Sequence, residues 1–409
     1  MKQQSPTVTT TEFAADAVEL LARTIRYSMR FDGGTTGTEH LLATLLDDNE
    51  KPGAALVPGM RNSAAVSGQI RGRDDRHWVH DDAFHGEPVA ADAPGEADNR
   101  FEAGAAWREA LWLAARKYAR KLPDGAVWPA RPSGALRESL VGAVRLTRAE
   151  GTYEVRERHL ARALLNVGAC RAVEAMAMRR VDPAAAASAL DARAEAVRDG
   201  AEPWWSEAEA ESGSVKLLRT SGLLGERGTW WMRGMMSLMS RSAGDGDPVL
   251  LVLSHEARRQ AARHGRSAAE QEDLLLAIPA LDRALTLAGA TSSGTPRSIG
   301  SVAGLLRSHG MDDALVTRAA DSAGQSAGSV PEDDAAIAAD ADAALAADAD
   351  RTLAKARLLC AERGAGPVGA EHLLAALLDD ADGRAVRLLQ DNGVDLTGVR
   401  DGLDLLLGA

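Results

Sequence analysis

The residues best suited to do chemistry in this chain are two glutamate-histidine pairs in nearly identical segments. Glu39 and His40 lie in Gly-Thr-Glu-His-Leu-Leu from residue 37, and Glu371 and His372 lie in Gly-Ala-Glu-His-Leu-Leu from residue 369. A glutamate in the first turn of a helix is either a ligand-binding group or a group that the helix dipole favours. We expect the two histidines to be packed and hydrogen-bonded rather than catalytic.

The residue before each glutamate differs between the two segments. Thr38 is a good helix N-cap, whereas Ala370 cannot cap. We therefore expect the second helix to start about 1 kcal/mol less favourably, unless Pro367 compensates by fixing the approach of the chain.

Patterns typical of enzymes fail in their sequence context. None of the six lysines follows a glycine, so the chain has no phosphate loop and no ATPase motor. Residues 364–369 fit a dinucleotide pattern by letter, but a predicted helix precedes them and Pro367 removes one amide. Ser254, His255 and Glu256 are adjacent, so on a helix they point in different directions and cannot relay a proton. We expect no enzymatic activity and no cofactor.

A histidine- and aspartate-rich stretch leaves two interpretations open. Its residues could ligate a metal ion, or they could form a solvated acidic loop, and we predict no specific metal site. The residues are His77, His80 and His85 with Asp74, Asp75, Asp81 and Asp82.

The bulk composition narrows the class of protein. Hydrophobic residues make up 45% of the 409 residues but aromatic residues only 4%, which favours helices packed through Ala, Leu and Val. A net charge of -12 argues against binding to nucleic acid or to an anionic membrane. Two cysteines, Cys170 and Cys360, do not suggest a disulfide framework, and no apolar run is long enough to span a bilayer. We expect a soluble cytoplasmic protein.

Four helical repeats of related layout position the glutamate-histidine pairs. In the second repeat Arg158 replaces the glutamate, and in the third Glu272 remains while Asp273 replaces the histidine. We predict an all-α fold of two pseudo-twofold domains, each built from two four-helix repeats. The first domain spans 8–200, with repeats at about 11–60 and 136–196 and an insertion at 61–135; the second spans 247–409, with repeats at about 249–320 and 346–407 and an acidic linker at 321–345.

The segments between repeats differ in character. Residues 71–99 are predicted to be a loop, followed by a helix over 107–122 with Trp107 and Leu111 on its apolar face. The connector 201–246 is rich in tryptophan and methionine, and either packs between the domains or binds a partner.

These segments resemble the N-terminal (Clp R) domain of Clp-type unfoldases, especially ClpC. The resemblance is carried by the Gly-Thr-Glu-His-Leu-Leu segment, by Thr-Glu-Phe-Ala from residue 11, and by Gly-Val-Asp-Leu from residue 393. It covers about two thirds of the chain, strongly in the first and fourth repeats.

The resemblance implies a module that binds substrates, adaptors or degradation signals and docks on an unfoldase. In ClpC-like members the glutamate helps to bind phosphorylated arginine, and the matching residues are Glu39, Glu371 and Glu272, with Thr11 matching a nearby threonine and Thr38 beside Glu39. We therefore expect a non-enzymatic adaptor or decoy whose partners are a Clp unfoldase, substrate peptides or adaptor proteins. The alternative is an interaction scaffold that uses the 201–246 connector.

Overall fold

The chain has the all-α fold that its composition predicts. A computed structural model describes residues 11–31, 34–47, 53–60, 63–73, 77–84, 95–119, 128, 131–198, 212–220, 224, 247–289, 295–311, 337, 345–364 and 367–408. They divide into two compact units: unit 1 lies within Met1–Ala210 and Pro331–Ala341, and unit 2 within Glu211–Val330 and Asp342–Ala409. Each unit has its own hydrophobic core.

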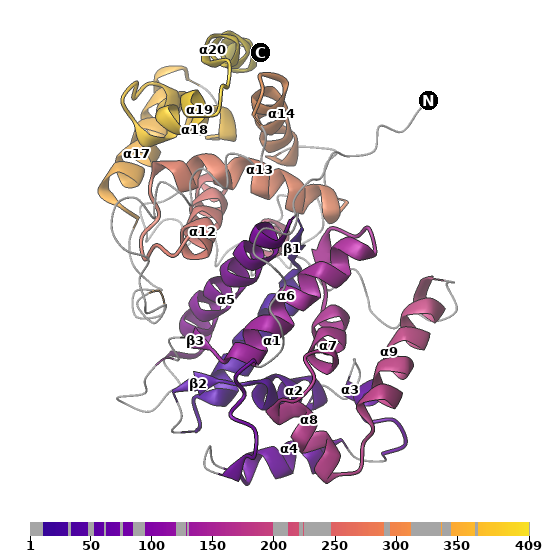
Figure 1. Cartoon of the computed structure of the whole chain (residues 1–409). Helices are drawn as coiled ribbons and strands as arrows, with labels where there is room; N and C mark the ends of the chain where they lie inside the picture. Colours follow the sequence, from indigo (N-terminus) through magenta and orange to yellow (C-terminus); the bar gives the residue numbers. More distant parts are fainter. Residues whose placement is uncertain are drawn as a thin grey trace. The chain divides into compact units, whose positions relative to one another are not determined.

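Unit 1 holds the first glutamate-histidine pair at the start of α2. In chain order its elements are β1 (Glu12–Phe13), α1 (Ala15–Ser28), β2 (Thr35–Thr36), α2 (Thr38–Asp47), α3 (Gly53–Leu56), α4 (Ala64–Arg71), α5 (Glu96–Tyr118), β3 (Arg131–Pro132), α6 (Gly134–Ala149), β4 (Glu154–Val155), α7 (Glu157–Asn166), α8 (Arg171–Met178) and α9 (Pro183–Arg198). They are coloured indigo to magenta in Figure 1.

Helix α5 of unit 1 starts earlier than the sequence predicts. Trp107 and Leu111 are buried as expected, but the helix begins at Glu96 rather than at residue 107. Glu96 is buried in the first turn, where Arg145 of α6 pairs with its carboxylate at 2.6 Å. This ion pair lets a polar helix start pack inside the unit, which an apolar-face pattern cannot reveal.

Two short parallel strand pairs join the halves of unit 1. β1 before α1 pairs with β4 before α7, and β2 before α2 pairs with β3 before α6. Each half therefore fixes the helix starts of the other half. The Ser28 hydroxyl at the end of α1 lies 2.8 Å from that of Thr36, so α2 begins beside the C-terminal end of α1.

Unit 2 holds the second pair at the start of α18. Its elements, coloured pink to yellow in Figure 1, are α10 (Gly213–Thr220), α12 (Pro248–Arg263), α13 (Gln271–Leu287), α14 (Thr295–Ser308), α17 (Ala347–Glu362), α18 (Ala370–Leu378), α19 (Arg384–Asp391) and α20 (Leu396–Gly408). Helix α10, which lies in the segment predicted as a connector, buries Val215 and Leu218 in the core of unit 2. The pseudo-twofold relation of the repeats stays a prediction.

In three of the four repeats, the second helix packs on the third helix of the other repeat in the same unit. α2 contacts α8 in unit 1, while α13 contacts α19 and α18 contacts α14 in unit 2. The glutamates near the starts of α2, α13 and α18 therefore face residues far away in the sequence. In the part of the chain that the structure describes, no helix is both long enough and apolar enough to cross a membrane.

Candidate functional site

The second helix of each of the four repeats starts with the same kind of hydrogen bond. The side chain of the third helical residue accepts the backbone N–H of the residue before the helix, which satisfies a donor that would otherwise lack a partner. The pairs are Gly37 with His40 (2.9 Å), Arg156 with His159 (2.9 Å), Glu270 with Asp273 (3.0 Å) and Gly369 with His372 (3.1 Å). The recurring histidine or aspartate is thus a helix cap.

His40 and His159 are buried and neutral. Burial, with a smaller effect of the Arg171 guanidinium, lowers the pKa of His40 to about 3. Burial likewise lowers the pKa of His159 to about 4. A neutral ring can accept the capping hydrogen bond through Nδ1. His40 and His372, each at most 4% exposed, are packed and hydrogen-bonded as predicted.

The prediction that Thr38 is an N-cap is wrong, and so is the expected loss of capping at Ala370. Both are the first helical residue, and the N-cap positions belong to Gly37 and Gly369. Since His372 supplies the cap of α18, Ala370 causes no loss of capping. The sequence alone could not separate N-cap from first helical residue, because threonine suits both.

Each glutamate folds back over the glycine that precedes its helix. A Cβ atom on Gly37 would lie 2.2 Å from Glu39 Oε2, and one on Gly369 would lie 2.2 Å from Glu371 Oε1. Neither glycine has a positive φ in this structure, so close approach of the carboxylate is the reason for glycine here. The Gly-x-Glu-His pattern therefore sets both the cap and the carboxylate position.

Glu39 lies in a closed site. Its side chain is 2% exposed, and Arg171 at the start of α8 donates to its Oε1 at 3.1 Å. Thr38 is fully buried beside it, and both its amide and its hydroxyl donate hydrogen bonds to the Asp82 carboxylate. Burial, and after it the Asp82 carboxylate, raise the pKa of Glu39 to about 7.

Glu272 is also enclosed by the chain's own arginines. Arg266 lies 3.3 Å and Arg384 3.7 Å from its Oε1. Burial raises the pKa of Glu272 to about 7 despite these cations. In the second repeat the charge is reversed, because Arg158 takes the glutamate position and donates to Glu150 at 3.1 Å.

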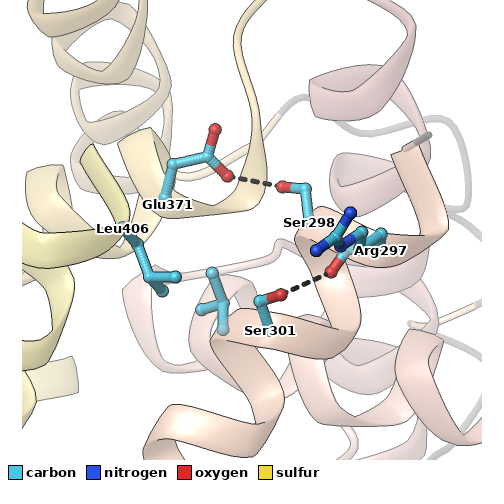
Figure 2. A pocket seen from close by; sticks show the side chains of 6 residues that line it. Arg297, Ser298, Ser301, Glu371 and Leu406 are labelled. Atoms are coloured by element: carbon cyan, nitrogen blue, oxygen red, sulfur yellow. Dashed lines mark hydrogen bonds between the residues drawn. The ribbon is translucent and has the colours of Figure 1, made fainter. Parts of the chain in front are cut away.

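Glu371 differs from the other two because it lines an open pocket. The pocket has a volume of about 280 Å³ and is bounded by α14, α18 and α20. Its lining residues are Arg297, Ser298, Ser301, Val302, Glu371 and Leu406, five of which are labelled in Figure 2. Glu371 is 20% exposed, and Ser298 donates a hydrogen bond to one of its carboxylate oxygens. The second oxygen points away from Ser298 in Figure 2.

Thr11 is not part of the Glu39 site. It is 4% exposed and precedes β1 at the N-terminal end of α1, whereas α2 begins beside the C-terminal end of that helix. A helix of 14 residues spans about 20 Å. Thr11 instead lies next to the β1–β4 pair, which leads into α7. The structure thus brings Thr38 to Glu39 but leaves Thr11 apart.

The remaining candidates have structural surroundings of their own. The Ser254 hydroxyl donates to the Leu250 carbonyl, and buried Glu256 accepts from Ser214. Among the described residues, no three His, Cys, Asp or Glu side chains gather as metal ligands would. His85, Asp74 and Asp75, and Trp204, Trp205, Trp230 and Trp231 of the connector, lie outside the described residues.

Sequence reasoning missed the residues that face the glutamates. Arg171 and Asp82 surround Glu39, while Arg297 and Ser298 face Glu371. Arg171, Arg297 and Arg384 all lie near the start of a repeat's third helix, and this shared position is a signal that the sequence does contain.

Comparison with known families identifies the last repeat. Residues 344–409 match the family model of the Clp repeat (R) N-terminal domain, a span that includes α17 to α20 and the Glu371 segment. No curated protein and no solved structure gives a significant match to the chain.

Proposed function

Because residues 344–409 match the family model of the Clp repeat (R) N-terminal domain, we propose that this protein is a non-enzymatic binding protein of the Clp unfoldase system. It binds peptides or degradation signals at the Glu371 pocket. The observation that carries the proposal is the partly exposed carboxylate of Glu371, which lines a pocket together with the apolar side chains of Val302 and Leu406. The glutamates of the other repeats are held by arginines of the chain itself.

The lining of the pocket suits a basic peptide side chain. Glu371 offers a carboxylate oxygen to a guanidinium or ammonium group, and Leu406 and Val302 can pack on its aliphatic stem. Arg297 adds a positive charge for an anionic group on the same ligand. A phosphorylated arginine has both charges, and it is the ligand that the resemblance to ClpC-like domains implies.

The partners in this proposal are a Clp unfoldase and its substrate peptides or adaptor proteins. The net charge of -12 supports a protein that binds neither nucleic acid nor an anionic membrane. Cys170 and Cys360 are both buried and form no disulfide, which fits a reducing cytoplasm. The alternative scaffold role rests on the tryptophan- and methionine-rich part of 201–246, most of which lies outside the described residues.

Adaptor and decoy roles make opposite predictions in a degradation assay. A reconstituted ClpC-type unfoldase and protease degrade a tagged substrate with and without this protein. An adaptor raises the rate and a decoy lowers it, and in both cases Glu371→Gln removes the effect while the exposed Glu362→Gln control keeps it. An effect that Glu371→Gln leaves intact would contradict the Glu371 site, and no effect of the native chain would contradict the Clp-system role.

A further inference from the structure

We propose that the Glu371 pocket continues onto α20 as an apolar strip, which binds a bulky apolar side chain next to the basic residue of a bound peptide. The strip consists of Leu305 of α14 and of Leu405 and Leu406 of α20. The inference rests on the function proposed for the pocket, and it adds a second determinant of the peptides that the pocket accepts.

The strip starts inside the pocket. Val302 and Leu406 both line the pocket with Glu371, and Leu406 reaches from α20 toward α14 in Figure 2. Leu305 follows Val302 by three positions, so the two side chains lie on the same side of α14. The apolar wall of the pocket therefore continues along α14 beyond the pocket itself.

A glycine brings α20 close to this part of α14. A Cβ atom on Gly402 would overlap Leu305 Cδ1, so Leu305 packs directly against the backbone of α20. Leu405 and Leu406 follow Gly402 by three and four positions, and thus lie one turn further along the same side of α20. The three leucines are therefore neighbours where the two helices meet.

Much of this apolar strip is accessible. Leu405 is 77% exposed and Leu406 is 36% exposed, while Leu305 is partly buried. A single exposed leucine is ordinary on a protein surface. An exposed leucine that extends an open pocket, however, offers apolar area to the ligand in that pocket, and burial of that area strengthens binding.

The charges around the strip decide which occupant it fits. Asp401 and Asp404 are exposed on α20 near Leu405, and neither pairs with a cation among the described residues. Together with Glu371 they make the surroundings acidic, which favours a peptide that carries a positive charge. A second copy of this chain would bring like charges together, and an anionic membrane would be repelled. A peptide with adjacent basic and apolar residues matches both the charge and the apolar surface.

Peptides that differ only beside an arginine test this inference in the full-length chain. Fluorescence anisotropy compares a labelled peptide that has leucine two positions before and after its arginine with one that has serine there, each with unmodified and with phosphorylated arginine. For the form that binds more tightly, we expect leucine to lower the Kd of the native chain about tenfold. Leu405→Ser should reduce this gain to about twofold or less. The control Leu358→Ser, which alters a leucine of α17 that is 57% exposed, should keep the gain.

The outcomes separate the strip from the pocket. Equal affinities of the leucine and serine peptides, or a leucine gain that survives Leu405→Ser, would overturn the inference, and weaker binding of both peptides by Glu371→Gln would still support the proposed function. A leucine gain that needs Leu405 while Glu371→Gln has no effect would support the strip and contradict the proposed function. Absence of any peptide binding would contradict both. Sedimentation velocity adds a further check, because a dimer of the native chain that Leu405→Ser dissociates would assign the strip to a second copy and overturn the inference.

Discussion

The starts of α2 and α18 have almost the same sequence but opposite accessibility. Both have a glycine N-cap, a capping histidine and a glutamate folded over the glycine. Yet the Glu39 side chain is 2% exposed beside Arg171, and the Glu371 side chain is 20% exposed in a pocket. The motif therefore fixes where the carboxylate lies, while the facing helix decides whether a ligand can reach it.

Charge reversal should reveal the difference between the two glutamates most strongly. Glu39→Lys places a second cation against Arg171 in a buried site, so we expect a loss of about 3–5 kcal/mol in the free energy of unfolding. The Glu371 side chain is partly exposed in a pocket, so Glu371→Lys should lower the free energy of unfolding by about 1 kcal/mol or less. Urea unfolding monitored by circular dichroism measures both, and equal losses would refute the difference in burial.

The pH dependence of stability should separate Glu39 from a carboxylate that the fold stabilises in its charged form. The pKa of Glu39 is raised to about 7 from an ordinary 4.5, so between these values the folded state binds more protons than the unfolded state. Its contribution to the free energy of unfolding therefore falls as pH rises through this window. As pH rises from 4.5 to 7.5, the free energy of unfolding of Glu39→Gln should increase by up to about 3 kcal/mol relative to that of the native chain.

Glu150 provides a control of opposite sign. Burial acts to raise its pKa, but hydrogen bonds from Arg158 and His159 outweigh burial and lower it. Its stabilising contribution is present above pH 4.5 and is lost as pH falls. Relative to the native chain, Glu150→Gln should therefore lose stability as pH rises from the acid range to about 4.5, and the difference should stay constant from there to neutrality. The same sign for both variants would contradict the assigned environments.

Loss of a capping histidine should weaken either helix start. His372→Ala leaves the buried Gly369 amide without its acceptor and opens a small cavity, so we expect a loss of about 2–3 kcal/mol. His372→Asn keeps a side-chain acceptor and should lose about half as much. Thermal and urea unfolding of the two variants would measure this difference in stability. Identical losses would mean that the histidine stabilises the fold through packing rather than capping.

The two glycines should respond differently to alanine. A Cβ on Gly37 or Gly369 would overlap the carboxylate of the glutamate two positions later, Glu39 or Glu371, to the same extent. Glu371 can swing into its pocket, so Gly369→Ala should cost less than about 1 kcal/mol of stability, whereas confined Glu39 should make Gly37→Ala cost about 1–2 kcal/mol. Denaturant midpoints compare them, and a larger loss for Gly369→Ala would reverse the assignment of open and closed sites.

The sequence predicts the helices better than it predicts their neighbours. Composition gave the all-α class, and apolar positions with intervening glycines gave helices close to their limits in the last repeat, because local pattern and burial agree there. The contacts of Glu39 were not predictable, since Arg171 lies 132 positions away along the chain. Asp82 sits in a stretch without periodicity, so nothing local distinguishes it from the exposed Asp81.

The central claim is that ligand binding uses Glu371 and not Glu39, and a binding titration tests it most directly. A labelled peptide carrying phosphorylated arginine, and its unmodified arginine form, would be titrated against the native chain, Glu371→Gln and Glu39→Gln by fluorescence anisotropy. We predict that Glu371→Gln weakens binding by about tenfold or more, while Glu39→Gln leaves the Kd within about twofold. Binding that depends on Glu39 and tolerates Glu371→Gln would contradict the account.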